Sequence, residues 1–107
     1  MNHEYTTQAP TRAEVDALSG PTVLEFGTVW CGYCKAAQPL LELALKDRTG
    51  LRHLKIEDGS GRVLGRTFGV TLWPTLVFLR DGKEATRAVR PTDVDTIRQA
   101  LAQIAAT

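Results

Sequence analysis

Two cysteines stand two residues apart in the stretch W-C-G-Y-C-K at positions 30–35, and the sequence contains no others. Thiols at this spacing are compatible with a reversible dithiol–disulfide couple, half of a metal site, or a structural disulfide. A chain of 107 residues can bury a hydrophobic core without a disulfide, which argues against the structural role. In a reducing compartment, a lone pair of this kind is more often catalytic or metal-binding than structural.

The composition describes an ordinary globular chain with little excess charge. The formal net charge is +1, and no basic stripe is present, which argues against nucleic-acid binding. The apolar runs are far shorter than the roughly 20 residues that cross a membrane, and the first ten residues lack the pattern of a signal peptide. We therefore expect a monomeric cytoplasmic protein with no membrane or nucleic-acid partner.

The hydrophobic pattern predicts alternating helices and strands. The expected elements are a helix after the capping box at 11–14, a strand at 22–27, a helix at 35–48, a strand at 51–57, a helix at 62–68, strands at 75–80 and 85–89, and a last helix from 91 onwards. This α/β order predicts a mixed sheet of four strands with helices on both faces. Residues 1–10 would be a loose segment or a short fifth strand, and residues 11–107 a single domain.

The cysteine pair follows a predicted strand and lies at the start of a predicted helix. Active sites of open α/β sheets collect at such strand ends. A helix N-terminus carries partial positive charge and free N–H groups, which favour the thiolate form of Cys31. Cys34 lies one turn further along the same helix face. This arrangement predicts that the Cys31 thiolate attacks a disulfide in a partner protein, and that Cys34 then displaces the reduced partner.

Glu25 interrupts an otherwise apolar strand just before the cysteines. Cys34 must lose a proton before it attacks, and a nearby carboxylate would accept that proton. Burial would raise the pKa of Glu25, which makes this residue a candidate acid/base. The pattern fits equally well with a Glu25 side chain that points to solvent at the edge of the sheet.

Beyond the cysteine pair, the chain resembles the thioredoxin family from about Val15 to Ile104. The features that match are F-x-x-x-W-C-G-x-C-K around the cysteines, a proline five residues after the second cysteine, F-G-V-x-x-x-P-T at 68–75, and a D-G hairpin after the next strand. The resemblance implies a thioredoxin fold and thiol–disulfide exchange, with Cys31 as the exposed nucleophile and Cys34 as the buried resolving cysteine. It also implies that no cofactor is bound and that an NADPH-dependent thioredoxin reductase recycles the pair.

The resemblance further implies a groove for disulfide-containing protein substrates. Pro74 matches the proline whose preceding peptide bond is cis in this family. The backbone of Trp73 would pair with an extended substrate strand, and Trp30, Gly32 and Tyr33 would flank the nucleophile.

Two residues on predicted strands, Glu25 and His53, are candidates for transfer of the Cys34 proton. Glu25 falls where the family carries its buried acid, usually an aspartate. His53 stands where the family usually has a lysine close to that acid. Because histidine titrates near neutral pH, a Glu25–His53 pair would act as a proton relay for Cys34. The alternative for His53 is a half-exposed strand histidine without a catalytic role.

Other departures from the family pattern concern the groove. Tyr33 replaces the proline between the cysteines, which predicts a less reducing couple. Gly27 replaces a tryptophan, and we expect the indole of Trp73 to fill part of that volume. Arg90 replaces a glycine on the docking surface, which should favour acidic partners.

Several functions remain open on the sequence alone. A disulfide oxidase or isomerase, or a reductase for one dedicated partner, differs from a general reductase in its reduction potential. A glutaredoxin-like use of glutathione matches the aromatic Tyr33. A metal site would need His3 and His53 as further ligands. A non-catalytic scaffold would have no need of the cysteines, Pro74 and a buried acid together, so a protein disulfide reductase is the preferred interpretation.

Overall fold

The computed structural model describes residues 1–105, and its helices and strands follow the predicted order. The elements are α1 (Arg12–Asp16), β1 (Pro21–Gly27), α2 (Gly32–Leu45), β2 (Arg52–Glu57), α3 (Val63–Thr67), β3 (Thr75–Arg80), β4 (Lys83–Val89) and α4 (Val94–Ile104). The last two residues of the predicted domain 11–107 lie outside the described residues.

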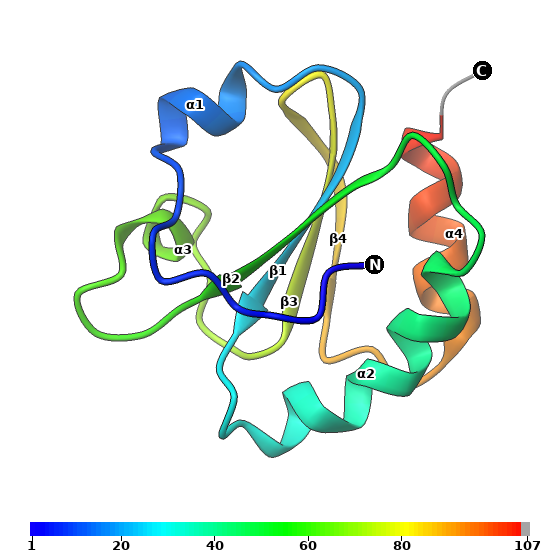
Figure 1. The fold of residues 1–107 in the computed structure, drawn as a ribbon, viewed down its shortest axis with the longest axis horizontal. Helices are drawn as coiled ribbons and strands as arrows, with labels where there is room; N and C mark the ends of the chain where they lie inside the picture. Colours follow the sequence, from blue (N-terminus) through cyan, green and yellow to red (C-terminus); the bar gives the residue numbers. More distant parts are fainter. Residues whose placement is uncertain (106–107) are drawn as a thin grey trace.

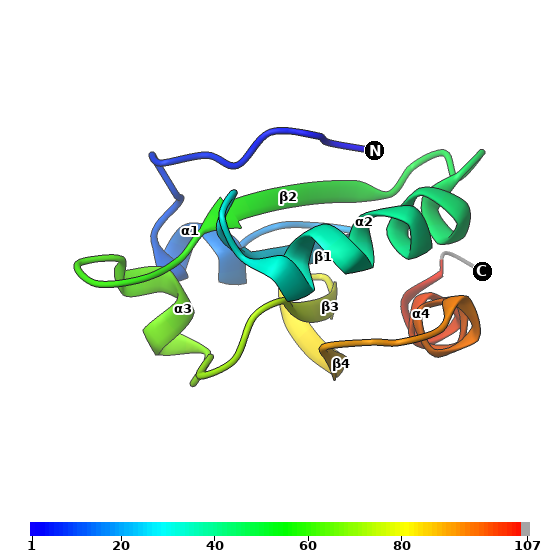
Figure 2. The same cartoon turned by 90° about the horizontal axis from the view of Figure 1, so that it is seen from below.

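The strands form one mixed sheet in the order β2–β1–β3–β4. β1 runs parallel to β2 and antiparallel to β3, and β3 pairs antiparallel with β4. Helices α2 and α4 cover one face of this sheet, and α1 and α3 lie on the other (Figures 1 and 2). The predicted four-stranded mixed sheet with helices on both faces is confirmed.

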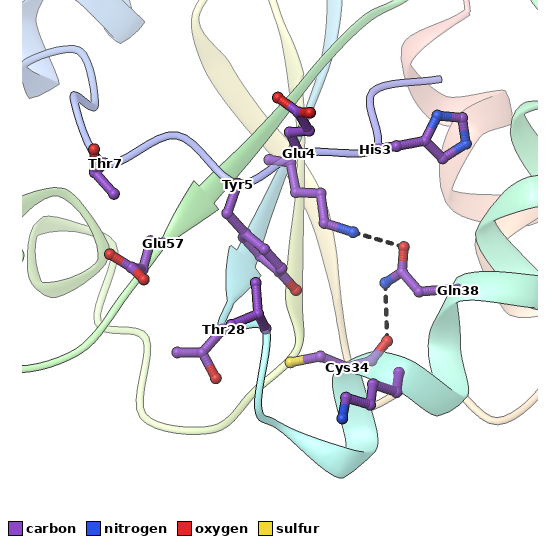
Figure 3. A pocket seen from close by; sticks show the side chains of 11 residues that line it. His3, Glu4, Tyr5, Thr7, Thr28, Cys34, Gln38 and Glu57 are labelled. Atoms are coloured by element: carbon purple, nitrogen blue, oxygen red, sulfur yellow. Dashed lines mark hydrogen bonds between the residues drawn. The ribbon is translucent and has the colours of Figure 1, made fainter.

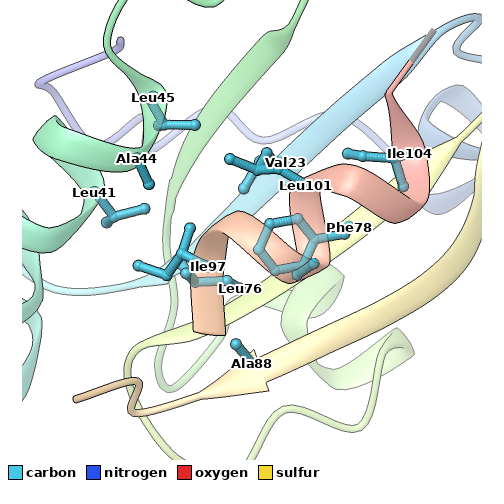
Figure 4. Close-up of a cluster of buried hydrophobic side chains, with 11 residues drawn as sticks. Val23, Leu41, Ala44, Leu45, Leu76, Phe78, Ala88, Ile97, Leu101 and Ile104 are labelled. Atoms are coloured by element: carbon cyan, nitrogen blue, oxygen red, sulfur yellow. The ribbon is translucent and has the colours of Figure 1, made fainter. Parts of the chain in front are cut away.

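Each face of the sheet has its own hydrophobic core. Under α2 and α4, apolar side chains from strands and helices interdigitate (Figure 4); they include Val23, Leu41, Leu76, Phe78, Ile97, Leu101 and Ile104. The opposite core, against α1 and α3, includes Val15, Leu24, Phe26, Ile56, Leu64, Phe68, Val77 and Leu79. Since successive strand residues point to opposite faces, Glu25 lies on the same face as Val23, beneath α2.

Helix α2 begins and ends earlier than its hydrophobic pattern predicted. Cys31 is the N-cap residue, and its Sγ accepts the backbone N–H of Cys34 at 3.1 Å, so the first turn contains the residues between the cysteines. The helix ends at Leu45 because Lys46 has an extended ψ of 134° and Asp47 has a left-handed φ of 60°. Both thiols are therefore part of the helix N-terminus.

The N-terminal segment makes a single β-bridge where a fifth strand was considered. Thr6 donates its N–H to the Lys55 carbonyl at 2.8 Å, and its own carbonyl accepts the Glu57 N–H at 3.1 Å. This bridge fastens the segment to the edge strand β2, along which it runs in Figure 2. The segment is thus held beside the sheet by one β-bridge, a placement that matters for the active site.

Candidate active site

The cysteine pair lies where β1 leads into α2. Cys31 Sγ accepts the Cys34 N–H at the helix N-terminus and lies 3.9 Å from the Trp73 carbonyl oxygen. Partial positive charge at this end of the helix favours negative charge on Cys31 Sγ. Cys31 is 7% exposed and Cys34 is 1% exposed. Cys31 is therefore the more accessible thiol, although it is more enclosed than the exposed nucleophile that we expected.

Cys34 sits in surroundings that disfavour its thiolate. Burial raises the pKa of Cys34 to about 11, and the neighbouring Cys31 sulfur adds to this effect, whereas the Thr28 backbone and the Tyr5 hydroxyl act in the opposite direction. Cys34 consequently holds its proton at neutral pH, and any nucleophilic attack by this thiol would require groups that help to remove that proton.

A pair of tryptophans borders the thiols. The Trp73–Pro74 peptide bond is cis, and Pro74 is buried. The rings of Trp30 and Trp73 meet edge to face with centroids 5.5 Å apart, and Trp30 is 69% exposed. Trp73 also donates its indole N–H to Asp58 Oδ2 at 2.8 Å. These contacts give the surface beside Cys31 an aromatic border formed by Trp30 and Trp73.

Arg90 is hydrogen-bonded to the Trp73 carbonyl oxygen, the backbone acceptor nearest to Cys31 Sγ. Its Nε donates to the Trp73 carbonyl oxygen at 2.8 Å, and its guanidinium carbon lies 3.9 Å above the ring of Tyr33. The Tyr33 side chain is otherwise directed to solvent, since the residue is 59% exposed. Gly32 is exposed and has no neighbouring atom within 4 Å of where a Cβ would lie. Arg90 thus places a positive charge and a hydrogen-bond donor at the position where an extended substrate strand was expected to pair.

A buried polar cluster lies behind Cys34, on the α2 side of the sheet. Glu25 is 0% exposed; its Oε1 lies 2.9 Å from His53 Nε2, and its Oε2 lies 3.4 Å from Lys55 Nζ. Gln38 donates to Glu25 Oε2 at 2.9 Å and to the Cys34 carbonyl oxygen at 2.8 Å. The side chain of His53 is only 4% exposed. The alternatives of a solvent-facing Glu25 and a half-exposed His53 are therefore wrong.

The pKa of Glu25 moves in the direction opposite to our expectation. Burial raises it, but hydrogen bonds from His53 and Gln38, together with the charge of Lys55, outweigh burial and leave the pKa below its ordinary value. The strand pattern left the burial of Glu25 open, and of the three partners only His53 was considered from the sequence. Gln38 comes from α2, and His53 and Lys55 come from β2. Glu25 is consequently a carboxylate at neutral pH, ready to accept a proton rather than to donate one.

The space beside Gly27 is filled by Tyr5 and not by Trp73, so our expectation for Trp73 is wrong. A Cβ at Gly27 would lie 2.5 Å from Cys34 Sγ and 2.9 Å from the Tyr5 hydroxyl oxygen. Figure 3 shows the phenol reaching from the N-terminal segment toward Cys34. Sequence reasoning missed Tyr5 because it stands in a polar stretch, and the one available signal was the unusual glycine at position 27.

A pocket of about 520 Å³ opens next to Tyr5 and Cys34. Its lining includes Tyr5, Thr28, Cys34, Gln38, Lys55 and Glu57 (Figure 3). Sequence reasoning also missed Gln38 and Lys55, whose types are common on exposed surfaces. Lys55 lies directly across from Glu25 in the β1–β2 register, which explains why it is buried.

The fold and the cysteine geometry match one family along nearly the whole chain. A family model described as thioredoxin matches residues 3–103. The chain belongs to the thioredoxin family. It is accordingly a thiol–disulfide oxidoreductase that uses the Cys31–Cys34 pair, and the metal-site, glutaredoxin-like and scaffold alternatives are not favoured.

Individual relatives agree with this assignment. The structure of reduced thioredoxin 2 from Pseudomonas aeruginosa PAO1 is 53% identical, with a TM-score of 0.86, and the match covers 97% of this chain and 96% of that one. A thioredoxin from Chlamydia muridarum is 34% identical over 79 residues, which are 74% of this chain and 78% of that protein. A bifunctional thioredoxin reductase/thioredoxin from Mycobacterium leprae is 31% identical over 84 residues, 78% of this chain and 18% of that protein.

Proposed function

We propose that this thioredoxin-family protein reduces disulfides in partner proteins, with Cys31 as the nucleophile and Cys34 as the resolving cysteine. The Cys31 thiolate attacks the partner's disulfide, forms a mixed disulfide and releases one partner thiolate. Cys34 then loses its proton and attacks Cys31 Sγ, which releases the second partner thiolate and closes the Cys31–Cys34 bond. The observation that carries this proposal is that the helix N-terminus donates to Cys31 Sγ, the more accessible of the two sulfurs.

We infer that Glu25 is the base that takes up the Cys34 proton. It is the one buried acidic residue in the described chain, it is ionised at neutral pH, and Gln38 links it to the backbone of Cys34. His53 completes the relay by holding the carboxylate from its other side. Transfer of the proton from Cys34 to Glu25 would form the thiolate while neutralising the buried carboxylate, so the net charge of the site would stay the same.

The substrate would lie over Pro74 and the aromatic border. Trp30, Gly32 and Tyr33 would contact it beside the nucleophile, and Trp73 would pair with its backbone. Because Arg90 already bonds the Trp73 carbonyl, pairing at that oxygen requires the arginine to turn away, for example toward a carboxylate of the partner.

We propose that an NADPH-dependent thioredoxin reductase returns the disulfide to the dithiol, while the chain itself holds no cofactor. The Mycobacterium leprae relative, named as a reductase joined to a thioredoxin, supports such a partnership. A reducing compartment such as the cytoplasm suits this cycle, and we propose a monomer. Among residues 1–105, no helix has the length and apolar character needed to span a bilayer.

The test is a coupled assay in which NADPH, a thioredoxin reductase and the protein reduce insulin disulfides. We expect NADPH consumption to depend on the protein. In a parallel titration in glutathione buffers, the Cys31–Cys34 midpoint should lie between the thioredoxin value of about −270 mV and about −200 mV, because tyrosine replaces proline between the cysteines. A midpoint above about −200 mV would instead support oxidation or isomerisation as the physiological direction.

A further inference from the structure

The hydroxyl of Tyr5 is buried beside the resolving cysteine and lacks a protein partner. The oxygen is shielded from solvent and makes no hydrogen bond within the described residues. Tyr5 is held there by the Thr6 bridge to β2 and by Lys55, whose Nζ lies 4.5 Å from the centre of its ring. A buried hydroxyl without an acceptor is costly, so its position calls for a physical reason.

The nearness of the Cys34 sulfur offers a physical reason for the position of the Tyr5 hydroxyl. The Cys34 sulfur and the Tyr5 hydroxyl lie on the same side of Gly27, where a Cβ would approach them to 2.5 and 2.9 Å. Any larger side chain at position 27 would occupy the space that the two groups share. Glycine is therefore a condition for bringing the phenol next to the sulfur. A thiol is a weak acceptor, whereas a thiolate is a strong one.

We propose that the Tyr5 hydroxyl donates a hydrogen bond to the Cys34 thiolate, and thereby promotes both the closing and the opening of the Cys31–Cys34 disulfide. The inference rests on the proposed reductase function and adds a residue to it. A donor already in place when negative charge forms on Cys34 stabilises that charge without rearrangement.

The step balances in both directions. During closing, the Cys34 proton leaves to Glu25 or solvent, and the Cys34 thiolate attacks Cys31 Sγ and expels the partner thiolate. During opening, a reductase thiolate attacks Cys31 Sγ, the Cys31–Cys34 bond breaks, and its electron pair remains on Cys34. Tyr5 keeps its own proton throughout and only shares it as a hydrogen bond. Burial, with the negative charge of Glu25, raises the pKa of Tyr5, so the hydroxyl stays protonated at any working pH.

Other charged groups face the same site and shape its pH dependence. They come from β1, β2, α2 and the N-terminal segment, and comprise Glu25, Lys55, Glu57, Cys31, Lys35, His3 and Glu4. Replacing tyrosine by phenylalanine leaves all of these in place and keeps the ring against Lys55. Tyr5→Phe therefore isolates the hydroxyl.

The experiment follows the reaction of the reduced protein with dithiobis(nitrobenzoate) by stopped flow. Attack by Cys31 releases the first thionitrobenzoate, and resolution by Cys34 releases the second. For Tyr5→Phe we expect the resolution phase at pH 7 to slow by about threefold while the first phase stays unchanged, because loss of one hydrogen bond to the thiolate lowers the thiolate population by about tenfold and raises the nucleophilicity of the thiolate that remains by about threefold. The pH midpoint of the resolution phase should move upward by about one unit.

Control variants distinguish an effect of the Tyr5 hydroxyl from a general effect of changing the N-terminal segment. Thr7→Val removes a neighbouring hydroxyl from the same segment and should leave both phases unchanged. Incorporation of a fluorotyrosine at position 5, whose hydroxyl is a stronger donor of similar size, should accelerate resolution. This second measurement stands even if Tyr5→Phe folds poorly.

The possible outcomes are distinct. Equal resolution rates and pH midpoints in Tyr5→Phe and the parent protein would overturn the role of Tyr5, as would equal slowing of both phases. If the parent protein released only one thionitrobenzoate, Cys34 would not resolve mixed disulfides, and the proposed function itself would fail.

Discussion

The imidazole of His53 is hydrogen-bonded to the carboxylate of Glu25 in the interior of the protein, with Nε2 2.9 Å from Oε1. The other ring nitrogen, Nδ1, accepts the backbone N–H of Asn2 at 3.0 Å. Because Nδ1 accepts, the proton of the ring lies on Nε2 and points at the carboxylate. The N-terminal segment therefore fixes the tautomer of His53, in which the ring donates a hydrogen bond to Glu25.

The charge on Glu25 should stabilise the folded protein at neutral pH. Glu25→Gln keeps the shape of the side chain but leaves Lys55, whose side chain is 5% exposed, without its carboxylate. We expect a loss of about 3 kcal/mol in the free energy of unfolding at pH 7, measured by urea denaturation. The exposed Glu42 offers a control, since its side chain is 54% exposed and Glu42→Gln should change stability by less than about 0.5 kcal/mol.

The stability difference between Glu25→Gln and the parent protein should depend on pH. The pKa of Glu25 in the folded protein lies below its ordinary value, so its stabilising effect is present above the unfolded value of about 4.3 and disappears as the pH falls through the folded value. The difference between Glu25→Gln and the parent protein should therefore be constant from about pH 5 to 7 and shrink below about pH 4. A difference that grew on acidification would mean that Glu25 is buried as a neutral acid.

Removing the resolving thiol should trap the partner. In Cys34→Ser the mixed disulfide on Cys31 has no internal thiol to displace it, so a stable adduct with a disulfide-containing protein should accumulate and turnover should fall to background. Non-reducing electrophoresis and intact-mass measurement would detect the adduct. The matched variant Cys31→Ser should form none. An adduct of equal yield in both variants would contradict the assigned roles, and an adduct only in Cys31→Ser would reverse them.

The sequence predicted the fold well because the fold rests on local patterns. Alternating apolar runs, the Thr11–Glu14 capping box and the Asp81-Gly82 turn each encode their own element, and the structure contains all of them. The position of Cys31 at the N-terminus of α2 also follows from order along the chain. Only the element boundaries shifted, most clearly in α2, whose cap is a cysteine side chain rather than an ordinary capping residue.

The surroundings of Glu25 and Cys34 were beyond the reach of the sequence because they depend on contacts between distant segments. Lys55 meets Glu25 through strand register, and Tyr5 reaches Cys34 through one β-bridge of a polar tail. Neither contact produces a periodic pattern of residues in the sequence from which it could be predicted. The sign of the Glu25 pKa shift was wrong for the same reason, since the contacts of Gln38 and Lys55 that lower this pKa could not be predicted from the strand pattern.

Arg90 should make the cysteine couple less reducing. Its guanidinium bonds the Trp73 carbonyl oxygen, from which Cys31 Sγ is 3.9 Å away, and a positive charge so placed favours the thiolate of the reduced form. Stabilising the reduced form raises the potential, so Arg90→Gln should lower the midpoint by about 15 mV, which corresponds to about 0.7 kcal/mol for a partly exposed charge. Arg90→Lys keeps the charge and should shift the glutathione titration by less than half as much. An unchanged or higher midpoint in Arg90→Gln would contradict this electrostatic role.

Arg90 should also select partners by charge. An extended substrate that approaches the Trp73 carbonyl must displace the guanidinium, and a carboxylate on the substrate gives that guanidinium a new partner. Among peptides with one disulfide, we expect a higher kcat/KM for acidic than for basic flanking residues. Arg90→Gln should reduce this preference by about fivefold and raise the rate with neutral peptides, because the carbonyl becomes free. The preference should weaken as ionic strength rises from about 0.01 to 1 M, since salt screens exposed charges. If Arg90→Gln kept the full preference at both ionic strengths, the selectivity would have to come from another charged group near the groove, and Arg66, exposed on α3 beside the pocket that Trp73 lines, would be the next residue to replace.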